Sequence, residues 1–201
     1  MVSALFTNQG LIECAFKSKS ESINYFLSQL ARYDSCTFRH SCKVEKIAVK
    51  LAIRLRLPPI MIQKLSTAAL LHDIGKISVP KSILQKPGKI TAAEFDVIKQ
   101  HPEVGFALLN ATDQLKDIAE AVLYHHEKFN GEGYPRKIAG NHIPLISRIL
   151  CIADVYEAIT SDRVYRSAMT EVEALQVICQ GAETHFDPSL VKDFLIFKAE
   201  C

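Results

Sequence analysis

Acidic and histidine side chains interrupt the most apolar stretches of this 201-residue sequence. His72 and Asp73 follow a run of alanine and leucine, and His125 and His126 follow Ala-Val-Leu. Asp154 interrupts another apolar stretch. Burying such polar groups without partners costs roughly 2–7 kcal/mol each. A bound metal ion would remove this cost, because imidazole nitrogens and carboxylate oxygens are good metal ligands.

Two further histidines occupy comparable positions, His40 within an early helix and His101 directly before Pro102. A single helical histidine is more often an ordinary core or surface residue than a ligand. His142 and His185 lack this context, and we interpret them as ordinary loop residues. The set as a whole is harder to explain without a metal. The candidate ligands are His40, His72, Asp73, His101, His125, His126 and Asp154.

This set of ligands predicts a hydrolytic metal centre. Imidazole and carboxylate without thiolate favour iron, manganese or zinc. Two ions that share a bridging aspartate would lower the pKa of a bound water and stabilise the oxygens of an in-line phosphoryl displacement. The sequence contains no G-x-S-x-G, Walker or G-x-G-x-x-G motif that would indicate another chemistry.

The elements that must position these residues are predicted to be helices. Apolar spacings of three and four precede a break at Tyr33-Asp34, and Thr91 to Glu94 has the spacing of a capping box. That capping box predicts a helix ending near His101. The other predicted helices cover about 44–55, 60–72, 114–127, 143–159, 171–180 and 188–198. A glycine-rich loop is expected from Lys128 to His142, and the whole predicts an all-α helical bundle.

The composition restricts the class of protein. The chain is 48% hydrophobic, which is enough for one domain with a buried core. Its formal net charge of only +2 argues against a DNA or RNA polymer as partner. Six scattered cysteines without a CxxC pair are typical of reduced thiols. We find neither a signal peptide nor a transmembrane stretch, so the expected location is the cytoplasm, without a membrane partner.

Several separated motifs occur in an order that resembles the HD-GYP domain family. They include His72-Asp73-Ile74-Gly75-Lys76, His101-Pro102-x-x-Gly105, His125-His126-Glu127 and Gly133-Tyr134-Pro135. The similarity covers roughly residues 36 to 197. It implies an HD-type helical bundle with a Gly-rich GYP loop beside a dinuclear metal site. We therefore expect the domain at 34–201 and an N-terminal helical extension of unknown role at 1–33.

The resemblance also implies roles for individual residues. One metal would take His40, His72, Asp73 and Asp154, and the second would take Asp73, His101, His125 and His126. Asp73 and Lys76 would be catalytic, and the implied substrate contacts are Lys76, Tyr134, Arg163 and Arg166. The implied cofactors are two divalent metal ions, iron or manganese. The implied reaction is hydrolysis of the bacterial second messenger c-di-GMP to the linear dinucleotide and GMP.

Three positions depart from the family pattern and leave alternatives open. Cys36 replaces a glutamate that binds a third metal in some members, Asn130 replaces an aspartate, and Glu157 replaces an aspartate. The last two leave open another cyclic dinucleotide such as cyclic GMP-AMP as substrate, or a mononucleotide. A non-catalytic scaffold is the remaining alternative. The partners left open are GGDEF-type or other signalling proteins and a second copy of the chain, as a homodimer.

Overall fold

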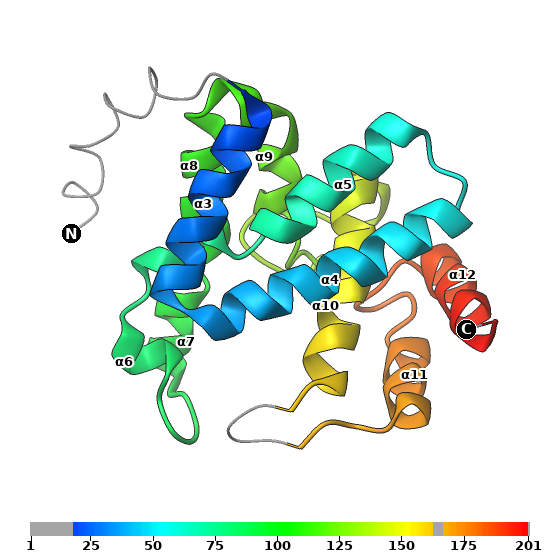
Figure 1. Cartoon of the computed structure of the whole chain (residues 1–201). Helices are drawn as coiled ribbons and strands as arrows, with labels where there is room; N and C mark the ends of the chain where they lie inside the picture. The colour runs from blue at the N-terminus through cyan, green and yellow to red at the C-terminus, as the bar shows by residue number, and fades with distance from the viewer. Residues whose placement is uncertain (1–17, 163–166, 201) are drawn as a thin grey trace.

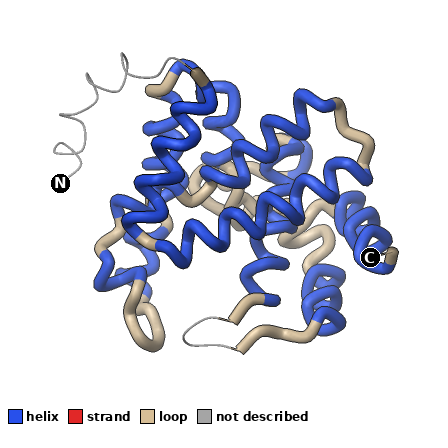
Figure 2. Tube along the Cα trace, viewed as in Figure 1, coloured by secondary structure: helices blue, strands red, loops and turns tan. Residues whose placement is uncertain are grey.

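A computed structural model describes residues 18–162 and 167–200, and this part of the chain folds into helices joined by loops (Figures 1 and 2). The α-helices are α3 Lys19–Tyr33, α4 Ser35–Arg54, α5 Pro59–Leu71, α6 Lys81–Leu84, α7 Ala92–Ile98, α8 His101–Asn110, α9 Lys116–Leu123, α10 Leu145–Thr160, α11 Glu171–Gln180 and α12 Pro188–Ala199. Within the same residues, the short 3-10 helices are η1 Ile74–Ser78, η2 Asp113–Leu115 and η3 Gly140–His142. The described residues contain no strand, which confirms the predicted all-α class.

Local sequence signals explain where several helices begin. Asp34 separates α3 from α4 and caps the N-terminus of α4. Its carboxylate accepts hydrogen bonds from the backbone N–H and the hydroxyl of Thr37. Thr91 and Glu94 form the predicted capping box of α7. A second capping box, Thr170 with Glu173, begins α11.

The prediction that a helix closes at His101 is wrong. Helix α7 ends at Ile98, and His101 instead opens α8, with Pro102 in its first turn. Proline is tolerated there because the first N–H groups of a helix have no intrahelical partner. His101 therefore lies at a helix N-terminus rather than at a C-terminus.

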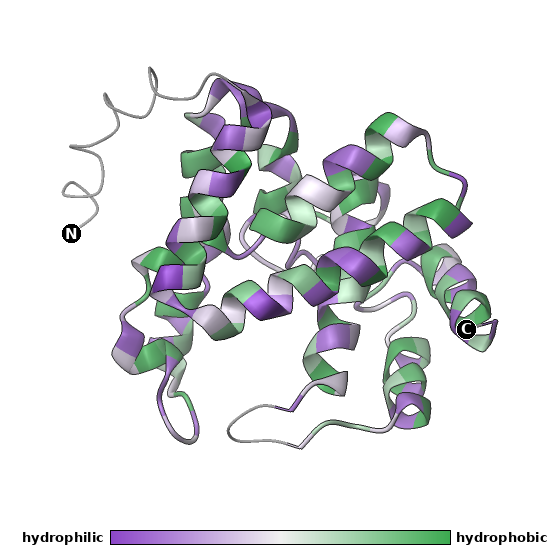
Figure 3. Cartoon of the chain, viewed as in Figure 1, coloured by the Kyte–Doolittle hydropathy of each residue, from purple (hydrophilic) through white to green (hydrophobic). Residues whose placement is uncertain are grey.

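Two hydrophobic clusters form the core. The first joins α4, α5 and α10 with α11 and α12, and includes Leu51, Ile149 and Phe194. The second joins α3, α5, α8 and α9, and includes Leu71 and Ile118. Along α3 and α4, polar and apolar residues recur with the spacing of amphipathic helices (Figure 3). Helix α5 contributes to both clusters and connects the two halves.

The segment before Asp34 is packed on the bundle where it is described. Helix α3 places Phe26 and Leu30 in the second cluster, and the Tyr33 hydroxyl donates to the carbonyl of Val79 over 2.6 Å. The domain division at residue 33 stays a prediction. Within the described residues, no helix combines the length and apolarity that crossing a bilayer requires.

Candidate metal centre

The seven predicted ligands gather at one place, where the two halves of the bundle meet. A first group comes from α4, the end of α5 and α10. His40 Nε2 lies 2.8 Å from Asp154 Oδ1 and 4.0 Å from Asp73 Oδ2. His72 Nε2 lies 3.4 Å from Asp73 Oδ2 and 3.9 Å from Asp154 Oδ1. These atoms surround a common point.

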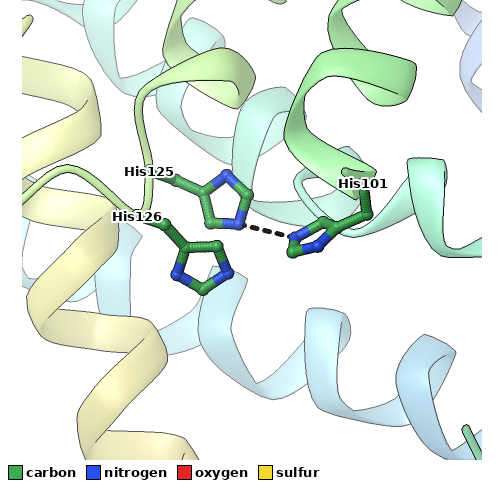
Figure 4. A group of neighbouring side chains, drawn as sticks. All are labelled: His101, His125 and His126. Carbon is green, nitrogen blue, oxygen red and sulfur yellow. Dashed lines mark hydrogen bonds between the residues drawn. The ribbon is translucent and has the colours of Figure 1, made fainter. Parts of the chain in front are cut away.

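A second group comes from α8 and the turn after α9. Figure 4 shows His101 facing His125 and His126 from the opposite side. His101 Nε2 lies 3.2 Å from His125 Nε2 and 3.2 Å from Asp73 Oδ1, and the rings of His101 and His126 are 5.0 Å apart. Asp73 therefore directs one carboxylate oxygen toward each group, as a bridging ligand would.

Three of the histidines are oriented by the same backbone contact. The Nδ1–H groups of His72, His101 and His125 donate to the carbonyls of Ala69, Ile98 and Val122, each three residues earlier, over 2.8, 2.8 and 2.6 Å. A carbonyl can only accept, so these contacts place the proton of a neutral ring on Nδ1. The Nε2 lone pair of each ring then points into the cluster.

This arrangement leaves acceptor atoms facing one another. The Nε2 lone pairs of His101 and His125 meet at 3.2 Å, and His101 Nε2 also faces Asp73 Oδ1. The buried atoms His72 Nε2 and Asp73 Oδ1 have no hydrogen-bond partner among the described residues. Unsatisfied buried acceptors are costly, and a divalent cation is the group that satisfies several acceptors at once. The residues therefore fit a metal centre.

Sequence reasoning treated Glu157 only as a departure from the family pattern, but the structure places it against His40. Glu157 is 3% exposed, and its Oε2 accepts from His40 Nδ1. Its Oε1 accepts from the Ser161 hydroxyl over 2.6 Å and lies 3.4 Å from Lys43 Nζ. A polar residue one turn after Asp154 on an otherwise buried helix was the available signal. Glu157 thus orients the His40 ring through Nδ1, as backbone carbonyls orient the rings of the other three histidines.

Electrostatics separate His40 from the two adjacent histidines of the second group. Burial opposes a charge on His40, but the carboxylates of Asp154 and Glu157 outweigh it and raise the pKa of His40 to about 9. Burial and the neighbouring His101 lower the pKa of His126 to about 3, and the pKa of His125 also lies well below its usual range through burial and His126. His125 and His126 are thus held neutral, as metal-ligating imidazoles must be.

Two of the predicted substrate contacts, Lys76 and Tyr134, lie against the ligand cluster. Lys76 Nζ donates to Asp73 Oδ2 over 2.7 Å, and the Tyr134 ring stacks on His126 with centroids 4.8 Å apart. Burial raises the pKa of the Tyr134 hydroxyl above its usual value. Arg163 and Arg166 lie outside the described residues. His142 is exposed and outside the cluster, whereas His185 lines a separate cavity.

The GYP loop is fixed close to the second group by its backbone. Gly133 packs so tightly that a Cβ would lie 2.3 Å from Lys128 N and 2.6 Å from His126 O. Glu127, which is buried, accepts from the backbone N–H groups of Arg136 and Lys137 over 2.6 and 3.0 Å. These contacts place Tyr134 beside His126.

A cleft of about 480 Å³ opens beside the centre. His40, Lys76 and Glu157 are among its lining residues, and Cys36 also lines it as an exposed thiol. Arg39 donates to the Cys36 sulfur over 3.2 Å. A ligand in this cleft would therefore meet both the metal centre and a set of cations.

Comparison with known proteins agrees with this geometry. The family pattern described as "HD domain" matches residues 26–190. "Cyclic di-GMP phosphodiesterase PA4108" of Pseudomonas aeruginosa is 38% identical over 170 residues, covering 84% of this chain and 41% of that protein. "3'3'-cGAMP-specific phosphodiesterase 3" of Vibrio cholerae is 40% identical over 124 residues, covering 62% and 27%.

A solved structure shares the fold. Bd1817, an HDG"Y"P protein from Bdellovibrio bacteriovorus, superimposes with a TM-score of 0.65 at 18% identity, covering 90% of this chain and 61% of that one. The chain spans less than half the length of the two curated relatives. The chain belongs to the HD domain family, within its HD-GYP group.

Proposed function

We propose that this chain hydrolyses the phosphodiester bonds of c-di-GMP, giving the linear dinucleotide and then GMP. The observation that carries the proposal is the convergence of five imidazoles and two carboxylates, with Asp73 between the two groups, beside a cleft that His40 lines. The similarity to a relative named as a cyclic di-GMP phosphodiesterase supports the substrate.

Two divalent ions, iron or manganese, are the proposed cofactors. His40, His72, Asp73 and Asp154 would hold one ion, and Asp73, His101, His125 and His126 would hold the other. Bound there, such ions activate water and neutralise phosphoryl charge. Two metals remain the proposal, with Cys36 as a wall residue of the cleft rather than a ligand.

The chain's own residues would orient the substrate. Lys76 presents its ammonium beside Asp73, where it would bind a non-bridging oxygen of the scissile phosphate. Tyr134, stacked on His126, would border the same phosphate, and Arg163 and Arg166 are proposed to bind the phosphates as bidentate donors. Asp73 orients Lys76 in addition to its proposed bridging role.

A second candidate substrate is 3'3'-cyclic GMP-AMP. A relative named for that substrate is 40% identical over 124 residues, compared with 38% over 170 residues for the one named for c-di-GMP. GGDEF-type signalling proteins and a second copy of the chain stay predictions as partners.

One experiment tests the proposal and separates the substrates. The purified chain, loaded anaerobically with Mn²⁺ or Fe²⁺, is incubated with c-di-GMP, 3'3'-cyclic GMP-AMP and a mononucleotide, and products are resolved by chromatography. We expect c-di-GMP to yield the linear dinucleotide, and Asp73→Ala to abolish the product. Intact c-di-GMP with the metal-loaded chain would refute the proposal, and faster cleavage of the hybrid dinucleotide would favour the second candidate.

A further inference from the structure

The cleft beside the metal centre has two walls of different chemistry. One wall carries cations from α4 and η1, and these are Arg39, Lys43 and Lys76. The other wall is apolar and comes from the segment 84–98, which holds α6, α7 and the loop between them. Its side chains are Leu84, Ile90, Phe95 and Ile98.

The apolar wall is not explained by folding. Phe95 is 45% exposed and Ile90 is 37% exposed. Helices α6 and α7 bury no residue, and the four apolar side chains of the wall belong to neither hydrophobic cluster. Exposing an aromatic ring and an isoleucine beside a cleft favours a ligand-binding role.

The wall is nevertheless held in place. Lys86 Nζ contacts both oxygens of Glu94 at 2.8 Å, which joins the two ends of the loop. The ammonium of Lys99 lies 4.8 Å from the centroid of the Phe95 ring and restrains its orientation. A ring fixed in this way loses little side-chain freedom when a planar ligand stacks on it.

The wall is also connected to the metal centre. The carbonyl of Ile98, the last residue of α7, accepts from His101 Nδ1 over 2.8 Å. The helix that carries Phe95 therefore orients a predicted metal ligand directly. A molecule whose phosphate reaches Lys76 and the metal centre would extend along this wall.

We propose that the apolar wall is a purine-base subsite in which Phe95 stacks on a base of the substrate and Ile90 borders it. This inference rests on the proposed function. By binding the base, the subsite would distinguish a nucleotide from a phosphodiester that carries no base. Cations on one side and an aromatic surface on the other match a ligand that carries phosphates and flat bases.

Calorimetry with two product-sized ligands tests this subsite without requiring turnover. GMP and ribose 5-phosphate share the phosphate and the ribose but differ in the base. We expect the Mn²⁺-loaded chain to bind GMP more tightly. Phe95→Ala should weaken GMP binding about five- to tenfold, in the lower range for a base–aromatic stack, and leave ribose 5-phosphate unchanged. Phe95→Leu should give an intermediate loss.

Controls distinguish a base subsite from general phosphate binding, from self-association and from the proposed hydrolysis itself. Val172→Ala removes an apolar side chain that is 67% exposed on α11 and does not line the cleft, so it should change neither affinity. Equal binding of the two ligands, or equal weakening of both by Phe95→Ala, would overturn the subsite. So would a self-association of the unaltered chain that Phe95→Ala abolishes. Base-dependent GMP binding in a chain that leaves c-di-GMP intact would support the subsite while refuting the proposed function.

Discussion

Hydrogen bonds to Nδ1 decide which nitrogen each histidine of the centre offers. His72, His101 and His125 lie at or beside helix ends, where the backbone carbonyl three residues earlier is within reach of the ring. His40 lies inside α4, so its Nδ1 uses a side chain, Glu157, from a different helix. Outer partners of this kind fix ring orientation and raise ligand basicity.

Glu157→Gln tests this role as a positioning residue. The amide keeps the shape but loses the charge beside His40 and the ion pair with Lys43, so we expect metal affinity to fall about ten- to a hundredfold. Glu157→Asp should recover part of that loss because it keeps the carboxylate. Competition with a chelator measures the affinity of each variant.

A matched control for this prediction is Glu120→Gln, which neutralises an exposed carboxylate on α9. It should leave metal affinity unchanged. A Glu157→Gln chain that binds both ions as tightly as the unaltered protein would show that His40 needs no carboxylate partner.

His185 gives a pH dependence at a residue outside the set of proposed metal ligands. Burial, reinforced by the nearby Lys128 ammonium, lowers the pKa of His185 to about 4. Its pKa in the unfolded chain is about 6.5. Between these values the unfolded state binds more protons, so stability is complete above about pH 6.5 and is lost as the pH falls toward 4.

We therefore expect His185→Gln to be less sensitive to acid. Because His185 is partly exposed, the loss that it causes should be about 1–2 kcal/mol. Urea unfolding of the metal-free chain at pH 7.5 and pH 5 measures it, with the exposed His142→Gln as control. An identical difference between the two pH values in all three proteins would contradict the prediction.

At the scale of elements, the contact between η1 and α8 sets the distance between the two ligand groups. Gly75 in η1 packs so closely that an added Cβ would lie 2.0 Å from the carbonyl oxygen of His101 and 2.7 Å from Gly105 N. Both neighbours are backbone atoms, which cannot rotate away. A side chain at this position must push α8, and with it His101, away from Asp73.

Gly75→Ala should therefore lower both stability and metal affinity. We expect a cost of about 2–3 kcal/mol, typical of overpacking in a well-packed core, together with weaker binding of the second ion. Urea unfolding and metal content by mass spectrometry measure the two effects. Gly140→Ala, where a Cβ meets nothing within 4 Å and only the positive φ of 58° opposes it, should cost about 1–2 kcal/mol and spare the metals.

The elements also show what sequence reasoning can reach. Apolar periodicity and the capping box at Thr91 predicted most helices, because both signals are local. His101 was assigned to the wrong end of a helix because proline is compatible both with the residue after a helix and with its first turn. The role of Glu157 depends on the packing of α10 against α4, which no local pattern contains.

At the scale of the whole molecule, the metal centre joins the two hydrophobic clusters. His40, His72 and Asp154 come from helices of the first cluster or the end of α5, which belongs to both. His101 and His125 come from α8 and the end of α9 in the second cluster. Ions shared by the two groups should therefore stabilise one half of the bundle against the other.

Metal removal should accordingly lower the stability of the entire fold. Binding at a free ion concentration of 100 times Kd adds about 2.7 kcal/mol for one site. For a chain of this size that corresponds to a rise of about 5–10 °C in the midpoint of thermal unfolding. Scanning calorimetry with Mn²⁺ and with excess chelator measures the shift.

Asp73→Asn, which removes the only carboxylate that faces both groups within the described residues, should show a much smaller shift. If Mn²⁺ raised the midpoint of Asp73→Asn as much as that of the unaltered chain, the ions would be binding elsewhere.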